Sequence, residues 1–297
     1  MKRNHTDTTN VRKGIFLAIL AAALYAISTP FSKLLLDFLP ARILAGVLYL
    51  GAGVCMMLIA LPRKITGKAQ NEISLTKKEL PYTLAMILLD IAAPICLLLG
   101  LKTAAAANAS LLNNFEIAAT SVIALVIFKE KISKRLFAGI IAILISCIVL
   151  TFEGEQSLQF SQGSLLILLA AVCWGFENNC TRQLSSCDPL QIVLIKGIFS
   201  GVGSVMIGLL MGERIDISDI IYIALALVLG FFAYGLSIYT YIYAQRFIGA
   251  ARTSAYYAIA PFIGVLISLL VLGERPGILY WPALAIMILG AYLCAEE

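Results

Sequence analysis

The chain is dominated by long apolar stretches that follow one another with short polar links between them. A bilayer core about 30 Å thick needs about 20 apolar residues in an α-helix. Inside lipid, a helix satisfies all of its own backbone hydrogen bonds. Apolar runs of helix length occur at ten places, residues 14–35, 41–61, 81–101, 107–128, 136–152, 163–184, 190–211, 219–244, 250–272 and 278–295. We therefore expect an all-α integral membrane protein with ten transmembrane helices.

The composition agrees with this expectation and excludes other classes of protein. Of the 297 residues 61% are hydrophobic and 13% are charged, whereas a soluble domain is about 25% charged. These values exclude an ordinary soluble enzyme and a disordered chain. The longest link, 62–80, leaves no room for a separate catalytic or nucleotide-binding domain.

The sequence predicts neither a cofactor nor an enzyme. The single histidine, His5, lies in the polar N-terminal tail, and the seven cysteines form no C-x-x-C pair. The chain contains no H-E-x-x-H, G-x-S-x-G or phosphate-binding G-x-x-x-x-G-K-[ST] motif. Its basic residues lie between the apolar runs and form no patch with interleaved aromatics. We expect no metal, no cofactor, no nucleic-acid partner and no enzymatic activity.

The distribution of Lys and Arg predicts the orientation in the membrane. If the N-terminus is cytoplasmic, sixteen of the 22 basic residues lie on the cytoplasmic side and five on the outside, while Lys196 lies within a run. Cytoplasmic links carry the excess of positive charge in membrane proteins. Ten spans then place both termini in the cytoplasm of a multi-pass protein of the cell membrane.

The two halves of the chain are similar to each other. Charged residues and prolines pair in the same order when the chain is shifted by 149 or 144 residues. The pairs are Gly14/Gly163, Lys33/Arg182, Pro40/Pro189, Ser110/Ser254 and Glu130/Glu274. We interpret residues 14–152 and 163–295 as two copies of a five-helix unit. Because five is odd, the copies are expected to be inverted in the membrane, with a substrate site near the midplane between them.

Several segments resemble a known family, the drug/metabolite transporters of the EamA type. The resemblance is carried by "GIFLAILAAALYAISTPFSKLLL", "GSLLILLAAVCWGFENNCTRQLS", "FKEK" and "LGERP", and by "AAAANASLLNNFEIAATSVIALVIFKEKISKR" in the fourth run. It implies ten helices in two inverted halves, and export or exchange of amino acids, amines or similar solutes. Two positions depart from the family pattern. Ile117 stands where members often have a mid-span proline, which Pro261 supplies in the ninth run, and Val47 stands where an arginine is frequent.

Four charged residues lie well inside the apolar runs, where a charge costs roughly 2.5–3.5 kcal/mol on insertion scales. They are Asp90, Glu116, Glu177 and Lys196. Each is expected to face a cavity or a partner. Asp90 is followed one turn later by Pro94, which could bend the third span and free carbonyls along a path.

Polar side chains accompany the two glutamates. Asn113, Glu116 and Thr120 share a helix face, with Ser110 and Asn114 close to it. Glu177 lies in "WGFENNCTR" near Trp174 and Asn178. We hypothesise that Glu116 or Glu177 binds a cationic group of the substrate or a coupling proton. The alternatives are interhelical hydrogen bonds for the Asn113 face and a salt bridge to Lys196 for one of the glutamates.

The repeat places a second polar group opposite the Asn113 face. Thr253, Ser254, Tyr256 and Tyr257 correspond to it in the ninth run, and the two tyrosines are candidates for a cavity wall. Tyr239, Tyr241 and Tyr243 are interpreted instead as residues of the interfacial belt.

These observations favour a secondary transporter that moves a small polar or amphipathic metabolite by alternating access, with coupling to protons as one option. The first, third, fourth, sixth, eighth and ninth spans would line the path. The partners expected are the small-molecule substrate and the lipid bilayer, and the chain would act as a monomer or a homodimer. The alternative is a channel or a non-transporting membrane scaffold.

Overall fold

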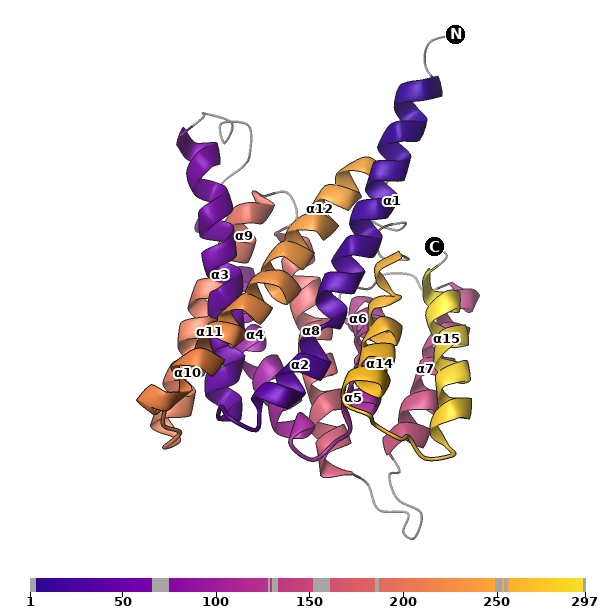
Figure 1. The fold of residues 1–297 in the computed structure, drawn as a ribbon. Helices are drawn as coiled ribbons and strands as arrows, with labels where there is room; N and C mark the ends of the chain where they lie inside the picture. Colours follow the sequence, from indigo (N-terminus) through magenta and orange to yellow (C-terminus); the bar gives the residue numbers. More distant parts are fainter. Residues whose placement is uncertain are drawn as a thin grey trace.

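A computed structural model describes residues 4–65, 75–127, 129, 133–151, 161–184, 187–248, 253 and 256–295. Within these residues the secondary structure is entirely helical (Figure 1). Seven segments are long and apolar enough to cross a membrane, and they fall on seven of the ten predicted runs. The molecule is therefore a multi-pass membrane protein.

The helices follow the order of the apolar runs. The first half contains α1 (Asn4–Ala26), α2 (Ser28–Leu35), α3 (Ala41–Ile65), α4 (Leu80–Leu101), α5 (Ala106–Leu112), α6 (Phe115–Val126) and α7 (Lys134–Thr151). The second half contains α8 (Gln162–Gln183), α9 (Pro189–Ile195), α10 (Gly201–Leu210), α11 (Ile220–Gly230), α12 (Ser237–Ile248), α14 (Ala260–Val271) and α15 (Tyr280–Ala295). Three short segments, η1 (Lys196–Ser200), η2 (Ile217–Asp219) and η3 (Phe231–Leu236), join consecutive helices.

Large apolar side chains cover the outside of the bundle. Phe16, Leu88, Ile148 and Leu266 are more than half exposed. Extended exposed apolar surface is unfavourable in water and marks a membrane or protein contact. Phe16 and Leu88 belong to segments that are long and apolar enough to cross a membrane, so this surface suits the hydrocarbon of the bilayer.

Two spans are interrupted near the middle. Pro30 has no amide hydrogen to give to the carbonyl of Ala26, and the helix axis breaks there between α1 and α2. The fourth run breaks between α5 and α6, although Ile117 replaces the proline of the family pattern. At this break the amides of Asn114 and Glu116 donate to the carbonyls three residues earlier, at 3.1 Å each. The helix therefore tightens into a 3₁₀-like turn and is not unwound.

Two other spans contain wider turns. The segments η1 and η3 are π-helical and lie inside the seventh and eighth predicted runs. Such turns are rare and occur often at functional sites. Lys196 is the first residue of η1, so the intramembrane lysine projects from an irregular part of its span.

Helices from the two halves pack in pairs. Residue contacts join α1 to α12, α4 to α8, α3 to α10, and α7 to α15 (Figure 1). The contact of α3 with η1 is especially close. A Cβ atom on Gly197 would lie 2.4 Å from the backbone nitrogen of Gly53. Glycine is required there because no side chain fits between the two backbones.

Charged side chains in the links at one end of the bundle bind the N-termini of neighbouring helices. Glu274 accepts hydrogen bonds from the amides of Ala106 and Ala107 at the start of α5, at 2.7 Å each. Glu213 accepts from the amides of Arg42 and Ile43 at the start of α3, at 3.1 Å each, and pairs with the Arg42 guanidinium at 2.9 Å. Both carboxylates thus bind helix N-termini, where unsatisfied amides and the helix dipole favour negative charge.

Candidate functional site

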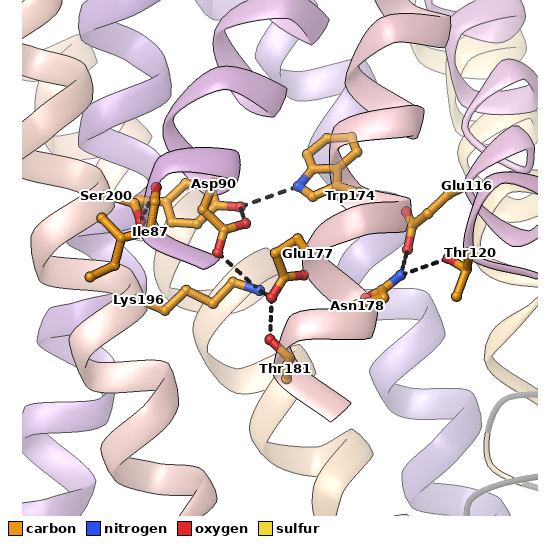
Figure 2. Close-up of polar contacts among 11 residues, drawn as sticks. Ile87, Asp90, Glu116, Thr120, Trp174, Glu177, Asn178, Thr181, Lys196 and Ser200 are labelled. Atoms are coloured by element: carbon orange, nitrogen blue, oxygen red, sulfur yellow. Dashed lines mark hydrogen bonds and ion pairs between the residues drawn. The ribbon is translucent and has the colours of Figure 1, made fainter. Parts of the chain in front are cut away.

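Three of the four predicted intramembrane charges form one cluster. Lys196 lies between two carboxylates, and its Nζ is 3.2 Å from Asp90 Oδ2 and 3.0 Å from Glu177 Oε1 (Figure 2). Asp90 comes from α4, Glu177 from α8 and Lys196 from η1. Asp90 is fully buried and Glu177 is 2% exposed. The salt bridge that the sequence left open for one glutamate therefore involves Glu177, and it includes Asp90 as well.

Neutral side chains complete the cluster and fix the carboxylates. The Tyr49 hydroxyl donates to Asp90 Oδ1 at 2.9 Å, and the Trp174 indole nitrogen donates to the Tyr49 oxygen at 3.4 Å. The Thr181 hydroxyl donates to Glu177 Oε1. Sequence reasoning identified Trp174 but missed Tyr49. The signal available was a lone tyrosine well inside an apolar run.

Glu116 lies beside this cluster but does not belong to it. Asn178 donates from Nδ2 to Glu116 Oε1 at 2.6 Å and to the Thr120 hydroxyl at 3.3 Å (Figure 2). The neighbouring Asn179 donates to the Thr120 carbonyl at 3.1 Å. These bonds join α6 to α8, as expected for interhelical hydrogen bonds in a membrane. Within the described residues Glu116 has no ion pair.

Unsatisfied polar atoms gather at the break between α5 and α6. Asn113 donates from Nδ2 to the Thr29 hydroxyl at 3.4 Å. Four further atoms are buried and have no hydrogen-bond partner among the described residues: Asn113 Oδ1, Oδ1 and Nδ2 of Asn114, and the Ser110 hydroxyl. Buried polar groups are nearly always paired. This part of the protein can therefore accept a polar ligand or water.

Tyrosines form one continuous aromatic cluster next to these groups. The ring of Tyr25 is 5.7 Å from that of Tyr257 and 6.0 Å from that of Tyr234, between ring centroids. The ring centroid of Tyr234 lies 5.2 Å from that of Tyr49, and the ring centroid of Tyr257 lies 5.0 Å from that of Tyr241. Tyr241 thus contacts a candidate cavity residue, although the sequence suggested a belt position.

The remaining predicted residues have less definite positions. Tyr256 is partly exposed and precedes the turn before α14, whereas Ser254 lies outside the described residues. The described residues contain no group of three or more His, Cys, Asp or Glu side chains placed to hold a metal ion.

A multi-pass helical bundle with charged and polar side chains buried at mid-span defines a membrane protein with a polar interior. Comparison with known proteins identifies its family. The sequence profile of the EamA-like transporter family matches residues 12–152 and 161–295. The chain belongs to this family and is a membrane transporter of the drug/metabolite transporter superfamily.

Individual proteins show the same similarity. An uncharacterized transporter of Methanothermobacter thermautotrophicus is 24% identical over 295 residues, which cover 94% of this chain and 85% of the relative. The uncharacterized transporter YyaM of Bacillus subtilis is 24% identical over 177 residues, which cover 57% of this chain and 58% of YyaM. A crystal structure of a protein 16% identical superposes with a TM-score of 0.66 over 96% of this chain and 95% of the other. This last likeness concerns the fold alone.

Proposed function

We propose that this protein is a secondary transporter that moves a small polar or amphipathic metabolite by alternating access. The observation that carries the proposal is the buried cluster of Asp90, Lys196 and Glu177, with Glu116 beside it. Charges at membrane depth are expensive and usually mark substrate or ion pathways. Carboxylates in such a place also suit coupling of transport to protons.

The packing supports an architecture of ten spans in two inverted repeats. In the proposed repeat, α1 corresponds to α8 and α12 corresponds to α4. A two-fold axis that relates the halves would therefore map the contact between α1 and α12 onto a contact between α8 and α4, and both contacts are present. The same axis would exchange α3 with α10 and α7 with α15, and the two helices of each pair pack against each other. Inverted repeats place the substrate site near the midplane between the halves, and the charged cluster joins α4 of one half to α8 and η1 of the other.

The distribution of basic residues supports a location in the cell membrane with both termini in the cytoplasm. The substrate is a small molecule such as an amino acid or an amine, moved by export or exchange. The chain would work as a monomer or a homodimer and catalyse no reaction.

A metabolite screen tests this proposal. Purified protein is reconstituted into liposomes loaded with a cell extract, and solutes that leave are identified by mass spectrometry against protein-free liposomes. We expect wild type to release at least one solute and Glu177→Gln to release it at least tenfold more slowly. Glu79→Gln is the matched control, because Glu79 is an exposed carboxylate that accepts from Thr76 at the start of α4.

Two results would contradict the proposal. One is that no solute leaves faster than from protein-free liposomes. The other is that Glu177→Gln and Glu116→Gln both transport at the wild-type rate. A flux that does not saturate would indicate a channel.

A further inference from the structure

We propose that Glu116, Asn113, Tyr25 and Tyr257 form a binding site for the protonated amine of the transported solute. This inference rests on the proposed function and specifies the substrate class as organic cations. It begins from a charge imbalance. Among the described residues, the mid-span polar region contains the carboxylates of Asp90, Glu116 and Glu177 and the ammonium group of Lys196; Asp90 and Glu177 are buried, and Glu116 and Lys196 are partly buried.

Lys196 is already occupied by two of these carboxylates. Its Nζ lies 3.0–3.2 Å from Glu177 and Asp90, so its charge is more than neutralised. Glu116 has no cation within ion-pair distance in the described part of the chain, and the hydrogen bond that it accepts comes from the neutral amide of Asn178. A carboxylate that is partly removed from water and has no cation beside it is costly. A positively charged ligand would remove that cost, whereas an anion would increase it.

A second acceptor lies on the same face as Glu116. The amide of Glu116 donates to the Asn113 carbonyl in the 3₁₀-like turn, at 3.1 Å. In such a turn side chains three residues apart are eclipsed. Asn113 is 7% exposed, and its Oδ1 is buried with no hydrogen-bond partner among the residues that the structure describes. The site therefore presents two oxygen acceptors, which suits the N–H donors of an ammonium group.

Aromatic rings lie at the same level of the bundle as these acceptors. The first and fourth spans run in opposite directions, since α1 lies above α2 and α6 above α5 in Figure 1. Thr29 and Asn113 are in contact, so Tyr25 and Glu116, one turn away along each chain, lie at the same level. The ring of Tyr257 is 5.7 Å from that of Tyr25.

Tyrosine rings attract cations through their negative faces, most strongly where water is excluded. A carboxylate, an amide oxygen and two aromatic rings together recognise an alkylammonium group. These four residues carry no positive charge, so they offer an anionic solute no counter-charge.

The experiment uses matched solutes that differ in charge. Liposomes containing the purified protein are loaded with ω-hydroxyalkylamines, the corresponding diols and the corresponding ω-hydroxycarboxylates of two, four and six carbons. Efflux at pH 7 is measured by mass spectrometry and corrected with protein-free liposomes. We expect at least one amine to leave at least tenfold faster than its diol and its carboxylate.

Variants then test the residues. Glu116→Gln is expected to lower amine efflux at least tenfold. Tyr25→Leu and Tyr257→Leu are expected to lower it about three- to tenfold, whereas Tyr25→Phe and Tyr257→Phe keep the ring and retain more than half. Glu79→Gln serves as the exposed control. Thermal unfolding in detergent verifies that each variant folds. If a Leu variant does not fold, the Phe variant at the same position is used for the transport measurement.

The outcomes separate this inference from the proposed function. If the diols or carboxylates leave fastest, or if Glu116→Gln transports amines at the wild-type rate, the amine site is wrong. The same holds if solutes of a cell extract exchange but no amine of the series does. If no solute of the extract exchanges, the transporter proposal fails instead.

Discussion

Lys196 is the residue on which the buried charges depend, because it is within 3.2 Å of both Asp90 and Glu177. Lys196→Met would leave two buried carboxylates without a counter-charge. Removal of one partner from a buried ion pair costs about 3–5 kcal/mol. We expect a correspondingly large decrease in the thermal unfolding midpoint in detergent.

Restoring the charge balance provides the control for this prediction. The triple variant Asp90→Asn, Glu177→Gln, Lys196→Met should recover most of the lost stability, because no unpaired charge remains. If Lys196→Met unfolds at the wild-type temperature, the ion pairs do not stabilise the folded state.

The sequence indicated which residues are unusual at this scale but not how they pair. Asp90, Glu177 and Lys196 could be identified because charges are rare in apolar runs. Which carboxylate meets Lys196 depends on how α4, α8 and η1 are placed against one another, and the sequence does not record that placement. Tyr49 and Thr29 were missed because single hydroxyl residues are common in membrane helices.

At the scale of the element, Glu274 connects the link after α14 to the start of α5. Glu274→Gln would replace two charge-assisted hydrogen bonds with weaker ones. Hydrogen bonds to charged groups contribute about 1.5–3 kcal/mol. We expect faster amide hydrogen exchange over residues 106–112, with no change near Glu79. Unchanged protection of α5 would show that this contact is not stabilising. Its counterpart in the proposed repeat, Glu130, lies outside the described residues.

The contact between α3 and η1 provides a second test. Gly197→Ala would place a methyl group 2.4 Å from the Gly53 backbone, so the two segments would have to separate. Overpacking of this kind costs about 1–3 kcal/mol. Gly277→Ala is the matched control, since no atom lies within 4 Å of the added Cβ. Equal unfolding midpoints for the two variants would contradict the close packing.

The apolar runs predicted the positions of the helices well, because length and hydropathy alone determine whether a segment can cross a membrane. The interruptions were harder to predict. The break at Pro30 follows from the missing amide of proline. The turn at Asn113 and Asn114 arises without a proline, and the π-helical segments η1 and η3 have no comparable signal in the sequence.

At the scale of the whole molecule, the positive charges predict cytoplasmic termini. A fluorescent protein fused after residue 297 should fluoresce, and alkaline phosphatase at the same position should be inactive. The opposite results are expected for fusions near Arg214, in the link between the seventh and eighth apolar runs, because a cytoplasmic N-terminus predicts that this link lies outside. An active phosphatase at the C-terminus would contradict both the orientation and the even number of spans.

The claim that a polar site is exposed alternately to the two sides has one direct test. Liposomes containing the protein are loaded with a labelled solute identified in the metabolite screen, and release is measured with and without unlabelled solute outside. Alternating access predicts faster release when the outer solution contains that solute, because a loaded transporter returns more readily than an empty one. Release unaffected by the outer solute, together with a rate that never saturates, would contradict the account and indicate a channel.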